Sequence, residues 1–167
     1  MPNMNLIRPA DGNEVSAAWA VAVETHDTPT LLVLTRQNLP VLEGTKEMAR
    51  EGVRKGAYVL SPQQGETPDG ILIATGSEVS LAIDAQAALL DEGVDVSVVS
   101  MPSAFLFEQQ DDAYKASVLP NNVRNRMSLE MGATLGWERY VGLDGIAYGI
   151  DRWGASGAGN TVVSNLG

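Results

Sequence analysis

The chain has 167 residues, 44% of them apolar, so its composition supports the core of one large domain or of one domain with part of another. Its formal net charge of −10 argues against nucleic acid and anionic membranes as main partners, because both attract basic surfaces. The sequence has no cysteine, which excludes a disulfide framework and a thiolate metal site, and its single histidine, His26, excludes a site of paired histidines within one copy of the chain.

The first forty residues predict one strand–helix–strand unit. Asn5–Ile7 is a short apolar strand, and Asp11 can cap a helix with Glu14 three residues further on, a variant of the capping box. The expected helix buries one face, made of Val15, Ala18, Trp19 and Ala22. Residues 30–34 then predict a buried parallel strand. This unit is too small to bury a core alone, and we expect it to belong to a larger sheet.

Residues 41–56 differ in character, because acidic and basic side chains alternate among glycines. This pattern predicts a solvated linker with a short helical turn rather than a binding element.

A second unit begins at Ala57. Strands are expected over residues 57–60, 71–75 and 94–99, with a helix between the last two that Ser77 caps and Gly93 ends. The apolar face of this helix is expected to consist of Leu81, Ala85, Ala88 and Leu89. The strand–helix–strand should have a right-handed crossover.

The remaining chain alternates short predicted elements. Short helices are expected over residues 105–114, followed by a strand over 126–130, a helical turn over 137–141 and a strand over 145–148. Neither an 18-residue apolar run nor a leader pattern ending in small residues is found, so we expect no membrane span, no signal peptide and a cytoplasmic location.

Arg36 is the leading candidate for a binding residue. It follows the strand predicted over residues 30–34, and open α/β sheets bind ligands beyond the carboxyl ends of their strands. A planar guanidinium can hold a phosphate or a carboxylate through two hydrogen bonds. The alternative is a structural salt bridge at a domain boundary. Gln37 and Asn38 add polar groups but no catalytic chemistry.

Two glycine-containing turns are weaker candidates. Thr75, Gly76 and Ser77 stand at a helix start, where free backbone N–H groups can bind an anion, but Glu78 would oppose one and a simple cap is favoured. Residues 154–159 have the spacing G-x-x-G-x-G, which is neither the dinucleotide fingerprint nor a P-loop, so a structural turn is favoured.

Four charged residues complete the candidates. Asp151 and Arg152 are adjacent and precede Trp153, and this pattern predicts an ion pair between them that fixes the tail. Glu130 ends a predicted strand as a lone carboxylate without a visible partner. His26 lies at a predicted helix end, where the helix dipole favours its protonated form, and is interpreted as surface structure.

Five segments, in order, resemble the C-terminal part of transketolase. They are Arg8-Pro9-Ala10-Asp11-Gly12-Asn13-Glu14, Thr35-Arg36-Gln37-Asn38-Leu39-Pro40, Lys55-Gly56-Ala57-Tyr58-Val59-Leu60, Ala74-Thr75-Gly76-Ser77-Glu78-Val79 and Gly149-Ile150-Asp151-Arg152-Trp153-Gly154-Ala155-Ser156-Gly157. The family usually has Phe where this chain has Trp153.

The resemblance implies a fold and a role for Arg36. It implies that residues 1–42 are the end of a pyrimidine-binding domain, 43–55 a linker and 56–167 the C-terminal domain, a three-layer α/β fold with a mostly parallel mixed sheet. Arg36 matches the family arginine that grips the substrate phosphate.

The resemblance also implies an activity that this chain alone would lack. Transketolase transfers a two-carbon ketol unit between sugar phosphates, as a homodimer, with thiamine diphosphate and Mg²⁺. The family's metal motif, its activating glutamate and its site histidines lie upstream of the matching segments. We therefore expect no catalytic, cofactor-binding or metal-binding residue here, and an inactive fragment or one half of a split enzyme.

Two other functions remain open. The chain could be a stand-alone module that binds a regulatory ligand or assembles subunits. A nucleotide-binding Rossmann domain is disfavoured, because the first tight turn lacks the glycine fingerprint.

Overall fold

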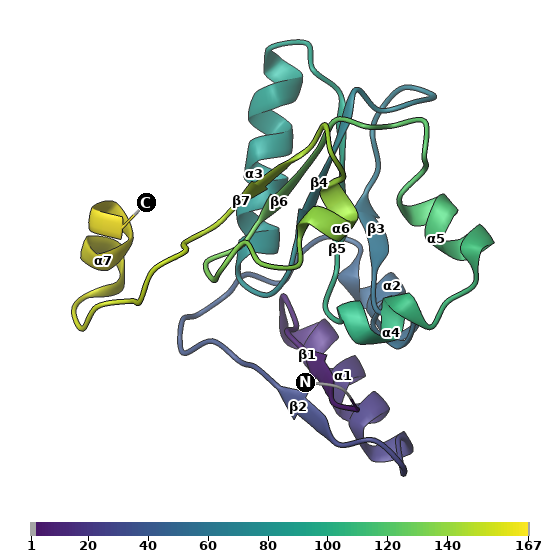
Figure 1. The fold of residues 1–167 in the computed structure, drawn as a ribbon, viewed down its shortest axis with the longest axis vertical. Helices are drawn as coiled ribbons and strands as arrows, with labels where there is room; N and C mark the ends of the chain where they lie inside the picture. The colour runs from purple at the N-terminus through teal and green to yellow at the C-terminus, as the bar shows by residue number, and fades with distance from the viewer. Residues whose placement is uncertain (1–2, 167) are drawn as a thin grey trace.

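The computed structural model describes residues 3–166. In the first unit, β1 (Asn5–Ile7) and β2 (Thr30–Leu32) form a two-stranded parallel sheet, and α1 (Gly12–Glu24) is the crossover between them (Figure 1). The predicted strand–helix–strand order is confirmed. The prediction that the second strand is buried is wrong for this chain, because one face of the small sheet has no covering layer and leaves Leu31 46% exposed.

The start of α1 is capped as predicted, but its buried face is rotated. Asp11 accepts hydrogen bonds from the backbone N–H groups of Asn13 and Glu14, each at 3.0 Å. The predicted face was wrong at Trp19, which is 56% exposed. The buried residues of α1 are instead Glu14, Ala17, Ala18 and Val21. Tertiary packing explains this difference, because the side of α1 that carries these residues contacts the helix that follows β2.

That helix, α2 (Thr45–Lys55), replaces the short helical turn predicted between the two units. It runs for 11 residues between Gly44 and Gly56, which both have left-handed backbone conformations. Ala49 and Val53 are buried in one apolar cluster with residues of β1 and α1, while the charged side chains remain outside it. The segment is therefore an integral layer of the first unit.

The second unit contains a five-stranded sheet in the order β3-β5-β4-β6-β7. Its strands are β3 (Tyr58–Ser61), β4 (Gly70–Ala74), β5 (Val96–Ser100), β6 (Arg126–Leu129) and β7 (Ile146–Tyr148). Only β3 runs antiparallel to its neighbour, and the other three pairings are parallel. The predicted mostly parallel mixed sheet is confirmed.

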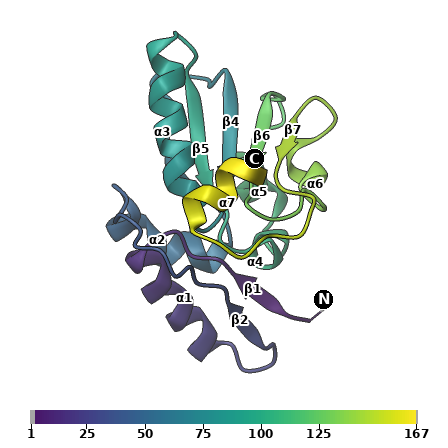
Figure 2. The ribbon, with the colours of Figure 1, turned by 90° about the vertical axis from the view of Figure 1, so that its left-hand side faces the viewer.

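Helices cover both faces of this sheet and make three layers (Figure 2). They are α3 (Glu78–Asp91), α4 (Ala104–Glu108), α5 (Asp112–Val118) and α6 (Glu138–Val141). Side chains of β4 alternate between the two cores: Leu72 joins the cluster that contains Val79 of α3, and Ile73 joins the cluster that contains Phe107 of α4. The last helix, α7 (Gly159–Leu166), lies apart from the sheet at the end of an extended segment (Figure 1).

The start of α3 differs from the prediction in two ways. Ser77 precedes the helix, but its hydroxyl makes no capping bond to the backbone and donates to the Glu78 carboxylate at 2.5 Å. Leu81 is exposed, whereas Val79 and Ala82 are buried. The helix ends near Gly93, as predicted, and Gly93 has a positive φ. Within residues 3–166, none of the helices has the length and apolarity needed to cross a membrane.

Candidate functional site

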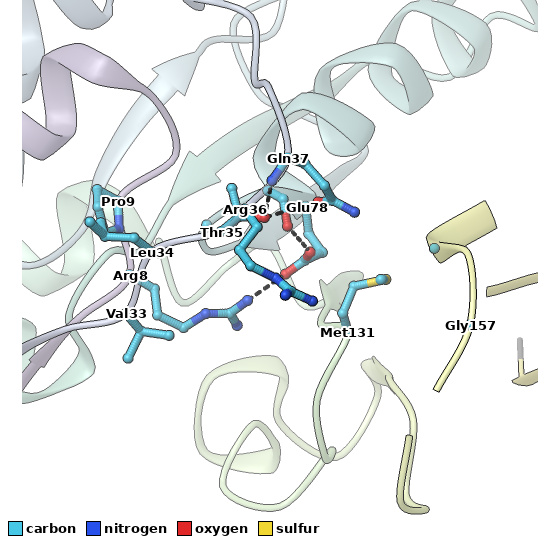
Figure 3. Close-up of a pocket in the computed structure, with 13 residues that line it drawn as sticks. Arg8, Pro9, Val33, Leu34, Thr35, Arg36, Gln37, Glu78, Met131 and Gly157 are labelled. Carbon is cyan, nitrogen blue, oxygen red and sulfur yellow. Dashed lines mark hydrogen bonds and ion pairs between the residues drawn. The ribbon is translucent and has the colours of Figure 1, made fainter. Parts of the chain in front are cut away.

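The carboxyl ends of strands from both sheets converge on one pocket of about 650 Å³, which we call the Arg36 pocket (Figure 3). The segments that line it follow β1, β2, β4 and β6, and the glycine-rich tail closes another side. The lining residues are Arg8, Pro9, Val33, Leu34, Thr35, Arg36, Gln37, Gly76, Ser77, Glu78, Met131, Gly157 and Gly159. This is the place where open α/β sheets bind ligands.

Arg36 lies four residues beyond the last residue of β2 and is exposed to the pocket. The turn that carries it is fixed by Thr35, whose hydroxyl accepts a 3.2 Å hydrogen bond from the Gln37 backbone N–H and donates to the Gln37 side chain at 3.0 Å. Among residues 3–166, Arg36 forms no ion pair. The charge and the N–H donors of its guanidinium are therefore available to an anionic ligand.

Arg8 is a pocket-lining residue that the sequence analysis did not single out as a candidate. It follows β1 as Arg36 follows β2, so the same positional rule was available to find it. Its guanidinium pairs with two carboxylates, Glu78 at 3.0 Å through Nη2 and Glu130 through Nη1. Arg8 is therefore the partner of Glu130 that was not visible in the sequence. Glu130 also accepts a hydrogen bond of 2.9 Å from the Gly132 backbone N–H.

The three charged groups are largely withdrawn from solvent. The side chains of Arg8, Glu78 and Glu130 are 22%, 5% and 10% exposed. Burial alone would lower the pKa of the Arg8 guanidinium, but the charges and hydrogen bonds of Glu130 and Glu78 outweigh it and raise that pKa above its ordinary value. Arg8 is thus charged, and each of its two terminal nitrogens is paired with a carboxylate.

The backbone of Arg8 is also held on both sides. Its N–H donates to the Pro102 carbonyl at 2.8 Å, and its carbonyl accepts from the Gly76 N–H at 3.1 Å and from the Thr75 hydroxyl at 3.2 Å. The N–H of Gly76 is therefore already used within the protein. This contact argues against the anion cradle that was considered for this turn.

Gly76 is required at this turn for two reasons. Its φ of +60° is one that side chains with a Cβ rarely adopt. A Cβ there would also lie 3.2 Å from Nη2 of Arg8. The glycine thus lets the guanidinium pass close to the backbone between β4 and α3.

Arg8 and Glu130 also line a second cavity, of about 450 Å³. Its walls include Met101, Trp137 and Tyr140. Since Arg8 belongs to both cavities and Glu78 only to the Arg36 pocket, the Arg8 side chain forms part of the partition between them.

A buried carboxylate, Glu14, joins the two units through hydrogen bonds. It accepts three hydrogen bonds of 2.7 Å, from the Ala10 backbone N–H and from the hydroxyls of Tyr58 and Ser100. Burial raises the pKa of Glu14, although the hydrogen bonds from Ser100, Ala10 and Tyr58 oppose this rise. Burial and the nearby Glu14 also raise the pKa of the Tyr58 phenol.

The capping residue Asp11 joins the start of α2 to the same network. Its second carboxylate oxygen accepts from the Leu42 N–H at 3.0 Å and from the Thr45 hydroxyl at 2.6 Å. Asp11 and Glu14 have structural partners on all sides, so neither is free for substrate chemistry in this arrangement.

The predicted ion pair between Asp151 and Arg152 was wrong. Asp151 instead accepts 2.7 Å bonds from the backbone N–H and the hydroxyl of Thr134, which lower its pKa, the backbone bond most strongly. Arg152 forms no ion pair within residues 3–166, and Trp153 is almost fully exposed. His26 lies on the surface just beyond α1, in agreement with its interpretation.

The part of the chain that the structure describes has no cluster of three or more His, Asp, Glu or Cys residues with metal-binding geometry. The described residues therefore do not fit a divalent-metal site of their own.

Family models match both units of the chain. The model described as the transketolase-like C-terminal domain matches residues 56–167, and the model of the transketolase pyrimidine-binding domain matches residues 1–41. All 167 residues are 59% identical to part of a transketolase of Bacillus subtilis and 58% identical to part of one of Streptococcus pyogenes. The chain spans about a quarter of these relatives, 25% and 23% of their lengths.

Solved structures show the same fold. The transketolase of Pichia stipitis in complex with sedoheptulose-7-phosphate is 44% identical with a TM-score of 0.89, covering 99% of this chain and 23% of that one. A transketolase from Leishmania mexicana is 41% identical, with a TM-score of 0.90, and covers 99% of this chain and 23% of that one. A split-gene transketolase subunit, at 18% identity, has a TM-score of 0.77 and covers 100% of this chain and 54% of that one, which shows the fold alone.

Proposed function

Because the chain belongs to the transketolase family, we propose that it serves an enzyme that transfers a two-carbon ketol unit from a ketose phosphate to an aldose phosphate. Within that enzyme its role is to bind the substrate phosphate through Arg36 and to supply structural and subunit-contact surface. The family assignment confirms the resemblance drawn from the five sequence segments.

The observation that carries the phosphate role is the position of Arg36. It is a cation without an ion-pair partner among the described residues, at the carboxyl end of a parallel strand, in a pocket of about 650 Å³. A cavity of this size accommodates a small phosphorylated metabolite. The planar fork of arginine matches two phosphate oxygens at once.

Residues 3–166 include no cluster of three or more acidic, histidine or cysteine side chains that could hold Mg²⁺. The diphosphate of the cofactor thiamine diphosphate needs a metal, and the donor set for one is lacking in the described part of the chain. We therefore derive no reaction step through the cofactor, and we propose that its site is formed by other parts of the enzyme. The isolated chain is accordingly proposed to be inactive.

The inactivity of the isolated chain is tested by calorimetric titration with thiamine diphosphate and Mg²⁺. We expect no binding in the micromolar range, and micromolar binding would refute this part of the proposal. The matching positive test is a chimaera in which these 167 residues replace the segment that they match in the Bacillus subtilis transketolase. The chimaera should transfer ketol units between sugar phosphates.

Inorganic phosphate provides a direct probe of Arg36 in the chimaera. If Arg36 binds phosphate, inhibition by inorganic phosphate should weaken about tenfold in the Arg36→Leu variant, since an ion-assisted hydrogen-bonded contact is lost. Arg152→Leu is the matched control, because Arg152 is exposed, lies outside the pocket and forms no ion pair among residues 3–166. Equal inhibition of both variants and the parent would contradict the assignment.

One observation favours a second role, in subunit assembly. The uncovered face of the β1–β2 sheet exposes Leu6 and Leu31, and Trp19 is exposed on α1. Exposed apolar surface of this kind is typical of protein contacts. We propose that the chain forms homodimers through such surface, and size-exclusion chromatography with light scattering tests this. A monomer at all concentrations would contradict it.

A further inference from the structure

Three charged side chains face the Arg36 pocket, and they are not equivalent. Arg8 has two carboxylate partners, Glu78 has one cationic partner, and Arg36 has none among residues 3–166. Figure 3 shows the Arg36 side chain extending into the pocket toward the Arg8–Glu78 pair. A carboxylate and a free guanidinium thus share one pocket without pairing.

Both oxygens of Glu78 are occupied in this arrangement. Oε2 accepts from Nη2 of Arg8 at 3.0 Å, and Oε1 accepts from the Ser77 hydroxyl at 2.5 Å. The carboxylate is 5% exposed, so it has little solvent to replace these partners. Removal of Arg8 would therefore leave the Glu78 carboxylate as a buried, unpaired charge, and pairing with another cation would stabilise it.

We propose that Arg8 is a positioning residue for phosphate binding: it holds Glu78 by an ion pair and so leaves the Arg36 guanidinium free for the substrate phosphate. This inference rests on the proposed phosphate role of Arg36. Without Arg8, Glu78 and the substrate phosphate compete for the same guanidinium. Arg8 itself makes no contact with the phosphate.

The surroundings of Arg8 suit this role. Its main chain is fixed by Pro102 and Gly76, so its guanidinium has a defined origin. Its second partner, Glu130, holds the other guanidinium nitrogen from the side of the second cavity. Backbone hydrogen bonds and the ion pair with Glu130 therefore fix the position of Arg8 while it pairs with Glu78.

Two double variants of the chimaera separate this role from a merely structural one. Arg8→Met with Glu130→Gln removes the arginine and leaves Glu78 unpaired in the Arg36 pocket. Arg8→Met with Glu78→Gln removes the same charges but leaves the carboxylate at Glu130, which lines the second cavity and not the Arg36 pocket. The two variants have equal net charge, and each retains one carboxylate from the original pair.

The readout is KM for a phosphorylated aldose and for the same aldose without its phosphate. We expect the variant that keeps Glu78 to raise KM for the phosphorylated aldose about tenfold, with little change for the other aldose, because one opposing charge acts across the pocket. The variant that keeps Glu130 should retain KM values near those of the parent. Arg124→Met, which breaks an exposed ion pair with Asp144, is the control for general effects.

Equal KM values for the two double variants would overturn the inference, whether both rise or neither does. If either double variant fails to fold, single Glu78→Gln decides: it should leave KM for the phosphorylated aldose equal or lower, and a rise would overturn the inference. Arg36→Leu is measured in the same series. If Arg36→Leu leaves the preference for the phosphorylated aldose unchanged, the proposed function itself fails, which is distinct from failure of the role of Arg8 alone.

Discussion

The phenol of Tyr58 donates a 2.7 Å hydrogen bond to the fully buried carboxylate of Glu14. This bond joins α1 of the first unit to β3 of the second, and the hydroxyl of Ser100 in β5 adds a second link to the same carboxylate oxygen. Polar groups buried at such a junction must all be satisfied, because an unpaired one is costly. The two units are thereby fixed at the relative position that forms the Arg36 pocket.

Removal of this phenol should destabilise the chain. We expect Tyr58→Phe to lower the free energy of unfolding by about 1–3 kcal/mol, because a buried carboxylate loses one of its donors. The midpoint and slope of urea unfolding measure this. Tyr148→Phe is the matched control, since Tyr148 is half exposed, and it should change little. Equal effects of the two substitutions would contradict the role of the bond.

The raised pKa of Glu14 predicts a pH dependence of stability. Its folded-state pKa lies above the ordinary 4.5, first because of burial, so the folded chain binds more protons at this site than the unfolded chain above that pH. The contribution of Glu14 is therefore complete below pH 4.5 and declines as pH rises toward the raised value.

Glu14→Gln should remove this decline, because the amide does not titrate. Urea unfolding measured from acid to neutral pH should show a smaller loss of stability in the variant than in the parent chain. Parallel curves for the two proteins would contradict the raised pKa.

The packing of α2 predicts a cost for truncation of Val53. This side chain is fully buried against α1, so Val53→Ala should lower the free energy of unfolding by about 2 kcal/mol. Val41→Ala, at an exposed position, should have almost no effect. Thermal or urea unfolding distinguishes them. A neutral Val53→Ala would instead support a solvated linker at residues 43–55.

The close approach of Arg8 to Gly76 predicts a difference between two glycine substitutions. Gly76 and Gly93 both have positive φ, but only at Gly76 would a Cβ meet Arg8 atoms. Gly93→Ala should cost about 1 kcal/mol of stability from backbone strain alone, and Gly76→Ala should cost more. If denaturant unfolding gives equal losses, the contact with Arg8 is not limiting.

Local patterns were sufficient to predict the sheet of the second unit and the position of Arg36. The apolar run that forms β4 is bounded by turn residues, and this signal is independent of the rest of the chain. Arg36 follows from one positional rule, and its location at strand ends is what that rule describes. Its proposed phosphate role stays a prediction.

Contacts between distant segments could not be predicted from local patterns. Arg8 is 70 residues from Glu78 and 122 residues from Glu130, so no short-range spacing indicates either ion pair. The buried face of α1 likewise depends on α2, which decides that Ala17 rather than Trp19 is covered.

One missed element did carry a signal. In α2, Ala49 and Val53 recur four residues apart, and Thr45 precedes them by four, which places all three on one face of a helix. The alternating charges around them favour the interpretation as a solvated linker. The same charges are also compatible with the solvated side of a helix.

The most direct measurement of the central claim is the substrate preference of the chimaera with Arg36→Leu. The ratio of kcat/KM for a phosphorylated aldose to that for the same aldose without phosphate isolates the phosphate contact from folding and cofactor effects. A phosphate-binding Arg36 predicts that this ratio falls by about tenfold or more, since a charge-assisted hydrogen-bonded pair is lost. An unchanged ratio, with kcat/KM for both aldoses lowered equally or not at all, would contradict the account.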